Sequence, residues 1–319
     1  MLFVALGMGS LVSIADSMVL IWAAPFLYIS SLFLLVVSYT GPAIRGATRW
    51  VSLGGMQLQP SELVKPFLLL FFAWAMKRWP PKTVMHIGMH TGLFLIPFFL
   101  VLRQPDLGSS IVYSVMWLAM MIAAGLPFRY VATAAVIGAL LLPLGWQGLH
   151  DYQRDRVLTF INPGQDPRGA GYNAIQSTIA VGSGQFFGRG LGRGTQSHLR
   201  FLPEYHTDFI FATLVEELGF LGGSILLVSY GVLLWRIIRP LVYGVTSAVV
   251  PFVYSVGLFS MILIQMVINA GMNMGLVPIT GITLPLVSYG GSSLFSLAVS
   301  YGVLWSIRAG RVDPIESLQ

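Results

Sequence analysis

Nine long apolar runs divide this 319-residue chain, and they leave few folds open to it. Crossing the hydrocarbon core of a bilayer takes about 20 apolar residues, and most of the runs approach that length. Backbone groups in lipid must bond to one another, so only helices and closed barrels span it, and barrel strands are shorter and alternate apolar with polar residues. The sequence therefore predicts an all-α polytopic membrane protein. The predicted segments are Leu2–Ala15, Met18–Tyr39, Glu62–Trp74, Val84–Leu102, Ser109–Gly125, Tyr130–Leu149, Phe209–Trp235, Thr246–Gly271 and Ser292–Ile307.

The composition agrees with that class and excludes others. Hydrophobic residues make up 55% of the chain and charged residues 9%, against about 25% charged in a typical soluble domain. There is no cysteine, which excludes a disulfide framework and a thiolate metal site. The net charge is +6, but the basic residues are divided between the two sides of the predicted membrane. We therefore expect membrane lipids with anionic head groups, and no nucleic acid, as their partners.

Lys and Arg near the segment ends predict the orientation, because basic loops stay in the cytoplasm. The short loops on the outer side hold only Arg45, Arg49 and Arg103. The long polar segment also lies outside, although it contains six arginines, because long loops are largely exempt from the rule. Met1 lies outside in this topology, so we expect a further helix before it, with nine of ten transmembrane helices visible. The basic residues of the cytoplasmic loops are Lys77, Arg78, Lys82, Arg129, Arg236, Arg239, Arg308 and Arg311.

Two outer segments break a chain that otherwise forms a single membrane domain, residues 1–319. Residues 150–208 are predicted to form a large extracellular loop rich in Gly, Arg, Asn, Gln and Asp. Residues 273–291 are apolar but interrupted by Gly and Pro, which is typical of a re-entrant or irregular segment that lines a cavity. Function concentrates on loops that a rigid scaffold positions, so we expect the working site at the end of the first segment.

Asp208 stands where the outer loop turns into a membrane helix. A carboxylate there can act as a general base, or it can cap the helix that follows, and the residues alone leave these interpretations equal. The nearby His206 is predicted to be structural rather than a second acid or base. Glu216 and Glu217 lie too deep for the chemistry and are expected to satisfy groups within the bundle.

Two further acidic residues lie at predicted outer helix ends. Glu62 and Lys65 are three residues apart and share one helix face, with Ser61 as the predicted N-cap. A structural ion pair is the simpler interpretation, because charges within a membrane usually pair. Asp106, close to Arg103, is likewise predicted to cap the next helix, with lining of the outer cavity as the alternative.

Spaced glycines surround Arg189 and Arg193 in the long loop. Such spacing occurs in phosphate-binding loops, but no strand and helix flank it, which argues against a nucleotide site. The planar fork of an arginine suits a diphosphate, whereas solvated loop charges are the simpler interpretation of either residue.

Three stretches, in order along the chain, resemble the SEDS family (shape, elongation, division and sporulation), and the resemblance covers essentially the whole sequence. They are Arg49-Trp50 through Gln59-Pro60-Ser61-Glu62-Leu63; Leu202-Pro203-Glu204 with His206-Thr207-Asp208-Phe209-Ile210-Phe211-Ala212 and Glu216-Glu217-Leu218-Gly219; and Leu284-Pro285 with Ser288-Tyr289-Gly290-Gly291-Ser292. Gly169-Ala170-Gly171-Tyr172 and Gln176-Ser177 resemble the rod-shape branch more than the division branch. Asn273 departs from the pattern, which has an apolar residue at that position.

The resemblance implies ten transmembrane helices and a peptidoglycan glycosyltransferase that polymerises lipid II into glycan strands at the outer face of the plasma membrane, for cell elongation and shape. It implies Asp208 as the catalytic carboxylate and Glu62 with Lys65 as a buried pair. It also implies a class B penicillin-binding protein as partner and a divalent cation, Mg2+ or Mn2+, with no organic cofactor. The residues expected to contact lipid II or the growing lipid-linked glycan are Arg45, Arg49, Glu62, Lys65, Asp106, Arg189, Arg193, Glu204, His206 and Ser288.

Other functions remain open at this point: a flippase or transporter of the lipid-linked precursor, a scaffold for a synthase, or a division-type member of the family. Broken helices and intramembrane ion pairs also occur in transporters. A transporter, however, needs no carboxylate at a junction of loop and helix, and the chain shows no clear internal repeat.

Overall fold

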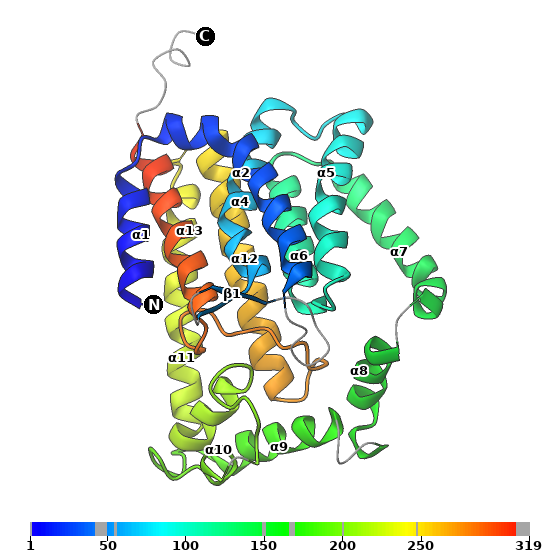
Figure 1. Cartoon of the computed structure of the whole chain (residues 1–319), viewed down its shortest axis with the longest axis vertical. Helices are drawn as coiled ribbons and strands as arrows, with labels where there is room; N and C mark the ends of the chain where they lie inside the picture. Colours follow the sequence, from blue (N-terminus) through cyan, green and yellow to red (C-terminus); the bar gives the residue numbers. More distant parts are fainter. Residues whose placement is uncertain are drawn as a thin grey trace. The chain divides into compact units, whose positions relative to one another are not determined.

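The computed structural model describes residues 2–41, 50–53, 56–148, 151–165, 170–199, 201–246 and 248–310 (Figure 1). Helices account for nearly all of its regular structure. In chain order the elements are α1 (Leu2–Ile14), α2 (Ser17–Val37), η1 (Ser38–Thr40), β1 (Val51–Leu53), β2 (Met56–Leu58), α3 (Pro60–Leu63), α4 (Lys65–Arg78), α5 (Val84–Leu102), α6 (Leu107–Ala123), α7 (Phe128–Gly148), α8 (Asp151–Ile161), η2 (Pro163–Gln165), α9 (Ala170–Ser183), α10 (Thr195–His198), α11 (Ile210–Val242), α12 (Val249–Asn273) and α13 (Gly291–Ala309).

All nine predicted apolar segments coincide with helices, so the helical membrane-protein class is confirmed. Among the described residues, four helical stretches are long and apolar enough to cross a bilayer: Ser17–Thr40, Val84–Leu102, Ile210–Val242 and Val249–Asn273. Shorter apolar helices occupy Leu2–Ile14, Leu107–Ala123 and Phe128–Leu141. The chain is thus a multi-pass membrane protein, and the number of helices that cross the bilayer stays a prediction.

The chain forms two compact units, each described here by itself. The first contains residues 1–127, 235–262 and 290–319, and the second contains residues 128–234 and 263–289. Helices α11 and α12 each contribute one end to the first unit and the other end to the second.

In the first unit, α1 and α13 pack along each other through small residues (Figure 1). A Cβ added to Gly9 would lie 2.7 Å from the carbonyl oxygen of Ala298, and one added to Gly302 would collide with the backbone of Gly9. The hydroxyl of Ser306 donates to the carbonyl of Ala15 at 2.8 Å. Membrane helices have little hydrophobic drive to associate, so such close backbone contact is what holds a pair together.

Helix α4 forms the centre of the first unit. Its leucines Leu68, Leu69 and Leu70 are at most 1% exposed, and the ring of Phe71 stacks on Tyr28 of α2 with centroids 4.0 Å apart. A helix that is apolar on all sides must be covered on all sides, which explains the position of α4 among its neighbours.

A short hairpin, β1–β2, precedes α3 in the first unit, and the apolar runs did not predict it. The two strands are antiparallel, with Val51 paired to Leu58 and Leu53 to Met56. Each strand has three residues, which is too few for an alternating pattern to stand out from loop sequence.

In the second unit, the polar segment 150–208 contains helices α8, η2, α9 and α10. The predicted large loop is therefore helical over much of its described length. A small core of Ala180, Leu202, Phe209 and Ala212 joins α9 to the start of α11, with Val181, Tyr205 and Ile279 packed against it. Residues 274–290 contain no helix, as their Gly and Pro content predicts.

Candidate active site

The backbone just before α11 is held in place at three consecutive carbonyls, all within the second unit. The amide of Tyr289 donates to the carbonyl of His206 at 2.9 Å, and the hydroxyl of Ser288 donates to that of Thr207 at 2.6 Å. The third carbonyl belongs to Asp208 and accepts from side-chain amides of α12. The acidic residue singled out by the sequence thus lies at the most firmly anchored part of this turn.

Two asparagines of α12 hold Asp208. The Nδ2 atoms of Asn269 and Asn273 lie 3.0 Å and 3.1 Å from its carbonyl oxygen. Asn273 also accepts, through Oδ1, the amide N–H of Ala212 at 3.2 Å. Helix N-termini leave N–H groups without partners in the helix, so this asparagine caps α11 from outside. A polar group at position 273, unexplained by the sequence, therefore has a structural reason.

The side chain of Asp208 is half-buried and faces Gly281. A Cβ added to Gly281, whose φ is +72°, would lie 3.4 Å from Asp208 Oδ2. The helix-free segment 280–289 is therefore a wall beside the carboxylate. Ser288 secures this wall, because its hydroxyl also accepts the amide of Leu284 at 2.7 Å.

Glu204 and His206, two predicted substrate-contacting residues, lie in the same turn. The hydroxyl of Thr207 donates to Glu204 Oε2 at 3.1 Å, and Glu204 adopts a φ of +57°, a region that L-residues seldom occupy. His206 is exposed, and its ring meets Tyr205 and Tyr289 edge to face. The structure thus brings Glu204, His206 and Ser288 together with Asp208.

Arg189 and Arg193 lie on a stretch that packs against a break in α11 at Gly219. The amides of Arg189 and Gly190 donate to the carbonyls of Glu216 and Glu217 at 2.9 Å and 3.0 Å. Arg189 Nη1 donates to Thr195 Oγ1 at 3.1 Å, and both Arg189 and Arg193 are exposed.

Glu216 fixes this stretch from within α11. It is fully buried, and its Oε1 accepts from Thr195 Oγ1 at 3.2 Å and from the amide of Gln196 at 2.9 Å. Glu216 is buried and hydrogen-bonded as predicted, but these partners lie in the polar segment 150–208 and not among the membrane helices. Glu217, beside it, is half-buried.

The remaining acidic candidates belong to the first unit. Lys65 Nζ lies 2.5 Å from Glu62 Oε1, with the two residues 1% and 7% exposed, so the predicted buried pair is confirmed. The prediction of Ser61 as N-cap is wrong, because Pro60 starts α3 and Gln59 takes the cap position.

Asp106 caps α6 as predicted, through a bond of 3.1 Å from the Ser109 amide to Oδ1. Its Oδ2 also accepts from Gln59 Nε2, Ser61 Oγ and Ser109 Oγ at 2.8–2.9 Å. Asp106 is 3% exposed. These contacts make it the centre of a buried polar network that joins α3 to α6.

Arg45 and Arg49, two further predicted substrate-contacting residues, lie outside the described residues.

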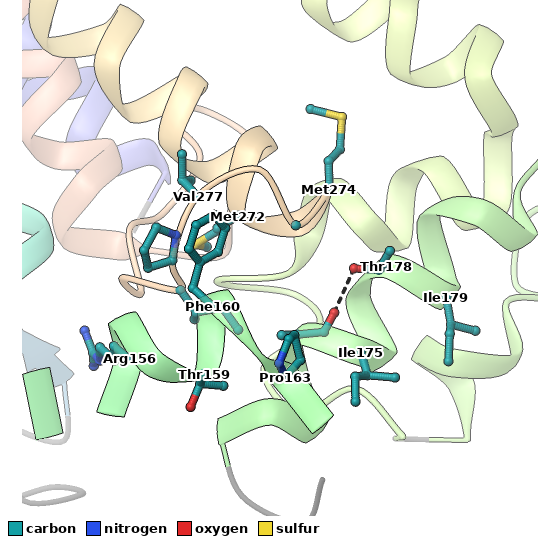
Figure 2. A pocket seen from close by; sticks show the side chains of 14 residues that line it. Arg156, Thr159, Phe160, Pro163, Ile175, Thr178, Ile179, Met272, Met274 and Val277 are labelled. Atoms are coloured by element: carbon teal, nitrogen blue, oxygen red, sulfur yellow. Dashed lines mark hydrogen bonds between the residues drawn. The ribbon is translucent and has the colours of Figure 1, made fainter. Parts of the chain in front are cut away.

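A cavity of about 370 Å3 lies within the second unit, between α8, α9 and the segment that follows α12 (Figure 2). Its lining is mostly apolar; Figure 2 shows Phe160 extending toward Met272 and Val277. Arg156 is the charged residue of the lining. The last residue of the cavity lining is Ile279, two residues before Gly281. One stretch of chain therefore borders both this cavity and Asp208.

The described residues contain no group of three or more His, Asp or Glu side chains that could hold a metal ion. Mg2+ usually takes only one or two protein carboxylates and completes its shell with water and substrate phosphates.

Sequence reasoning missed Asn269, Asn273 and Gly281 as parts of this site. A signal was present for the asparagines, since polar side chains four residues apart in an apolar membrane helix share a face and need partners. Their partner, a backbone carbonyl 61 and 65 residues away, could not be read from the sequence.

Comparison with known proteins shows which family the chain belongs to. The FtsW/RodA/SpoVE family model, described as "cell cycle protein", matches residues 1–312. The peptidoglycan glycosyltransferase MrdB of Escherichia coli K12 is 43% identical over 291 residues, 90% of this chain and 78% of its own. The stage V sporulation protein E of Bacillus subtilis is 39% identical over 282 residues, 86% and 75% of the two chains.

Solved structures of similar proteins support the same family membership. A chain from a peptidoglycan synthase complex that coordinates polymerization and crosslinking superimposes with a TM-score of 0.80 at 33% identity, over 96% of this chain and 87% of that one. The rod shape determining protein RodA of Thermus thermophilus gives a TM-score of 0.68 at 30% identity, over 96% and 85%. The chain belongs to the FtsW/RodA/SpoVE family, the SEDS proteins that its motifs resemble.

Proposed function

We propose that this protein is a peptidoglycan glycosyltransferase that polymerises lipid II into glycan strands at the outer face of the plasma membrane, with Asp208 as general base. The curated relatives named peptidoglycan glycosyltransferase support the reaction class. The observation that carries the assignment of Asp208 is its setting: a half-buried carboxylate at a turn whose backbone is bound at three successive carbonyls.

The chemistry needs such a group. A sugar hydroxyl is a weak nucleophile, and a carboxylate within hydrogen-bond reach accepts its proton as the oxygen attacks the anomeric carbon of the donor. The anomeric carbon loses its bond to the lipid diphosphate in the same step, so the configuration inverts. Positioning of the base accounts for much of the rate, because a displacement of about 1 Å can cost on the order of 100-fold.

The departing diphosphate requires charge stabilisation. Arg189 and Arg193 are our candidates, with Arg45 and Arg49 as further ones, since guanidinium groups bind phosphate oxygens through paired donors. A divalent cation, Mg2+ or Mn2+, would supply additional charge neutralisation at the diphosphate. Glu204, His206 and Ser288 border the carboxylate and would contact the sugars.

The cavity between α8, α9 and the segment after α12 is our candidate binding site for part of the polyprenyl chain. Ligand cavities of about 300–1,000 Å3 with apolar linings are typical of sites for apolar molecules. The continuity of its wall with the segment beside Asp208 supports this use. Replacement of Ile175 by Trp, which fills the cavity, should raise KM for lipid II more than it lowers kcat.

Glu62, Lys65 and Asp106 were also expected to bind substrate. Their contacts favour a supporting role, because each charged group is nearly inaccessible and bonded within the first unit. We propose that they hold α3, α4 and α6 in place and affect substrate only through that scaffold.

The decisive experiment compares Asp208→Asn with the parent and with Asp155→Asn, which alters an exposed carboxylate on α8 of the same polar segment. Each purified protein receives labelled lipid II and Mg2+, and glycan products are separated by length. We expect Asp208→Asn to lose at least about 100-fold in rate and Asp155→Asn to stay near the parent. Equal polymerisation by Asp208→Asn and the parent would refute the assignment.

A lipid transporter is the second candidate function, since broken helices also occur in transporters. The same preparations, reconstituted in vesicles with labelled lipid II in one leaflet, test it. Transfer between leaflets without any polymer from the parent protein would favour transport over glycosyl transfer.

We further propose a class B penicillin-binding protein as partner and a role in elongation rather than division. The neighbour from a synthase complex that couples polymerization to crosslinking supports a partner of that kind. Polymerisation measured with an elongation-type and a division-type partner would separate the two roles, because the cognate partner should stimulate the rate more.

A further inference from the structure

Asn269 and Asn273 are fully buried carboxamides on a mostly apolar helix, and the reaction above uses neither. Four residues apart, they lie on one face of α12. A buried amide without hydrogen bonds destabilises the fold, so both residues need partners. Those partners show what the pair does.

All the donors of the pair are engaged. Asn269 Nδ2 donates to the carbonyls of Asp208 at 3.0 Å and of Ile282 at 2.7 Å. Asn273 Nδ2 donates to the carbonyls of Asp208 at 3.1 Å and of Asn269 at 2.7 Å. A carboxamide nitrogen carries two donors, so these bonds use both on each residue. An Asp, Leu or Met at either position could not make the same set.

The pair therefore links three parts of the site. It binds the backbone of Asp208, the first turn of α11 through Ala212, and the wall segment through Ile282, which follows Gly281. Gly281 is the residue that faces Asp208 Oδ2. A change in the pair shifts the carboxylate relative to both the helix and the wall.

We propose that Asn269 and Asn273 form an amide clamp that positions the Asp208 carboxylate for proton transfer. The proposal rests on the proposed function and extends it to two positioning residues that do not touch the substrate. The clamp acts on the Asp208 carbonyl, while the carbonyls of His206 and Thr207 keep their bonds to Tyr289 and Ser288. Its loss should therefore misplace the base without unfolding the turn.

The two amides bind the same carbonyl, so each can partly replace the other. Asn269→Leu and Asn273→Leu should each lower kcat by about 10-fold, and the double variant should lower it by about 100-fold or more. KM for lipid II should stay within about twofold of the parent, because binding contacts are unchanged.

Gln265→Leu is the matched control. It makes the same kind of change, a buried carboxamide to leucine, one turn earlier on the same face of α12. It should keep kcat within about twofold of the parent. Asn269→Ser and Asn273→Ser, which remove the amide but keep a small polar group, are tested in parallel in case the leucine variants do not fold.

The outcomes separate the two proposals. Loss of kcat at unchanged KM in the Asn variants, but not in Gln265→Leu, supports the clamp. An unchanged kcat in the folded double variant, leucine or serine, overturns it while Asp208→Asn still decides the function. An equal loss in Gln265→Leu, or a loss confined to KM, also overturns it, because neither follows from displacement of the base.

Discussion

Asp106 and Asp208 are both acidic residues next to the start of a helix, and the contacts around them differ. At Asp106 the carboxylate itself is bound, by donors from Gln59, Ser61 and Ser109, and the residue is 3% exposed. At Asp208 the amide clamp binds the backbone carbonyl, and the side chain is half-buried. The first arrangement uses the acid to join helices. The second fixes the position of the acid and leaves the wall beside it lined by a glycine.

The difference shows why position in the sequence was a poor guide to role. Both residues looked like helix caps, and Asp106 is one. At α11, the amide of Ala212 in the first turn is bound by Asn273 of α12. A residue of another helix can thus cap a helix end, which is a tertiary effect that local patterns do not reveal.

Removal of one partner of the buried pair should give the largest loss of stability. Lys65→Ala leaves Glu62 buried without its cation, and such changes cost about 3–5 kcal/mol of unfolding free energy. The double variant Glu62→Gln/Lys65→Met removes both charges and should recover most of that loss. Thermal unfolding in detergent measures both. A stable Lys65→Ala protein that cannot polymerise lipid II would show that the Glu62–Lys65 pair also serves catalysis. The difference in role between these buried charges and Asp208 would then disappear.

Particular elements show how much of the fold could be predicted from the sequence. Each long apolar run coincides with a helix of the described residues, because burial in lipid demands length and hydrophobicity that are visible residue by residue. The Glu62–Lys65 pair was predictable because its partners are three residues apart on one helix. The cap at α3 was not, because Pro60 at the first helical position shifts the cap to Gln59.

The candidate site was predictable in its centre and not in its surroundings. Asp208 stood out as an acid at the junction of a polar segment and an apolar one. Its amide clamp, the wall at Gly281 and the helices within residues 150–208 all depend on contacts between distant segments. Such contacts are fixed by packing, and a single sequence does not display them.

A direct test of the contrast replaces each aspartate by asparagine. Asp106→Asn replaces a carboxylate that accepts several hydrogen bonds by an amide whose NH2 group faces other donors. We expect this to lower the free energy of unfolding by about 1–3 kcal/mol. Asp208→Asn should cost less stability than Asp106→Asn, because the hydrogen bonds to the Asp208 carbonyl remain and its side chain is less buried than that of Asp106. Unfolding midpoints and polymerisation rates are compared for the two. Equal destabilisation would mean that the Asp208 side chain is as structural as that of Asp106.

Gly281 tests the wall beside Asp208, and Gly244 provides its control. Gly281 has a φ of +72° and Gly244 one of +68°, so an alanine at either site costs about 1–2 kcal/mol of backbone strain. The new Cβ of Gly281→Ala would lie 3.4 Å from Asp208 Oδ2, whereas that of Gly244→Ala would have no atom within 4 Å. We expect similar unfolding midpoints but a rate about 10-fold lower for Gly281→Ala. Equal rates would mean that the carboxylate works away from this wall.

The smallest effect is expected at Ser288, which binds the Thr207 carbonyl next to Asp208. Ser288→Ala loses this bond and the one from the Leu284 amide, for about 0.5–1.5 kcal/mol each. Ser229→Ala is the control, since that hydroxyl is exposed and donates only to Ile225 of its own helix. Because the amide clamp still holds Asp208, Ser288→Ala should reduce kcat less than the Asn269→Leu/Asn273→Leu double variant does. A larger reduction would show that the wall segment, and not α12, sets the position of the base.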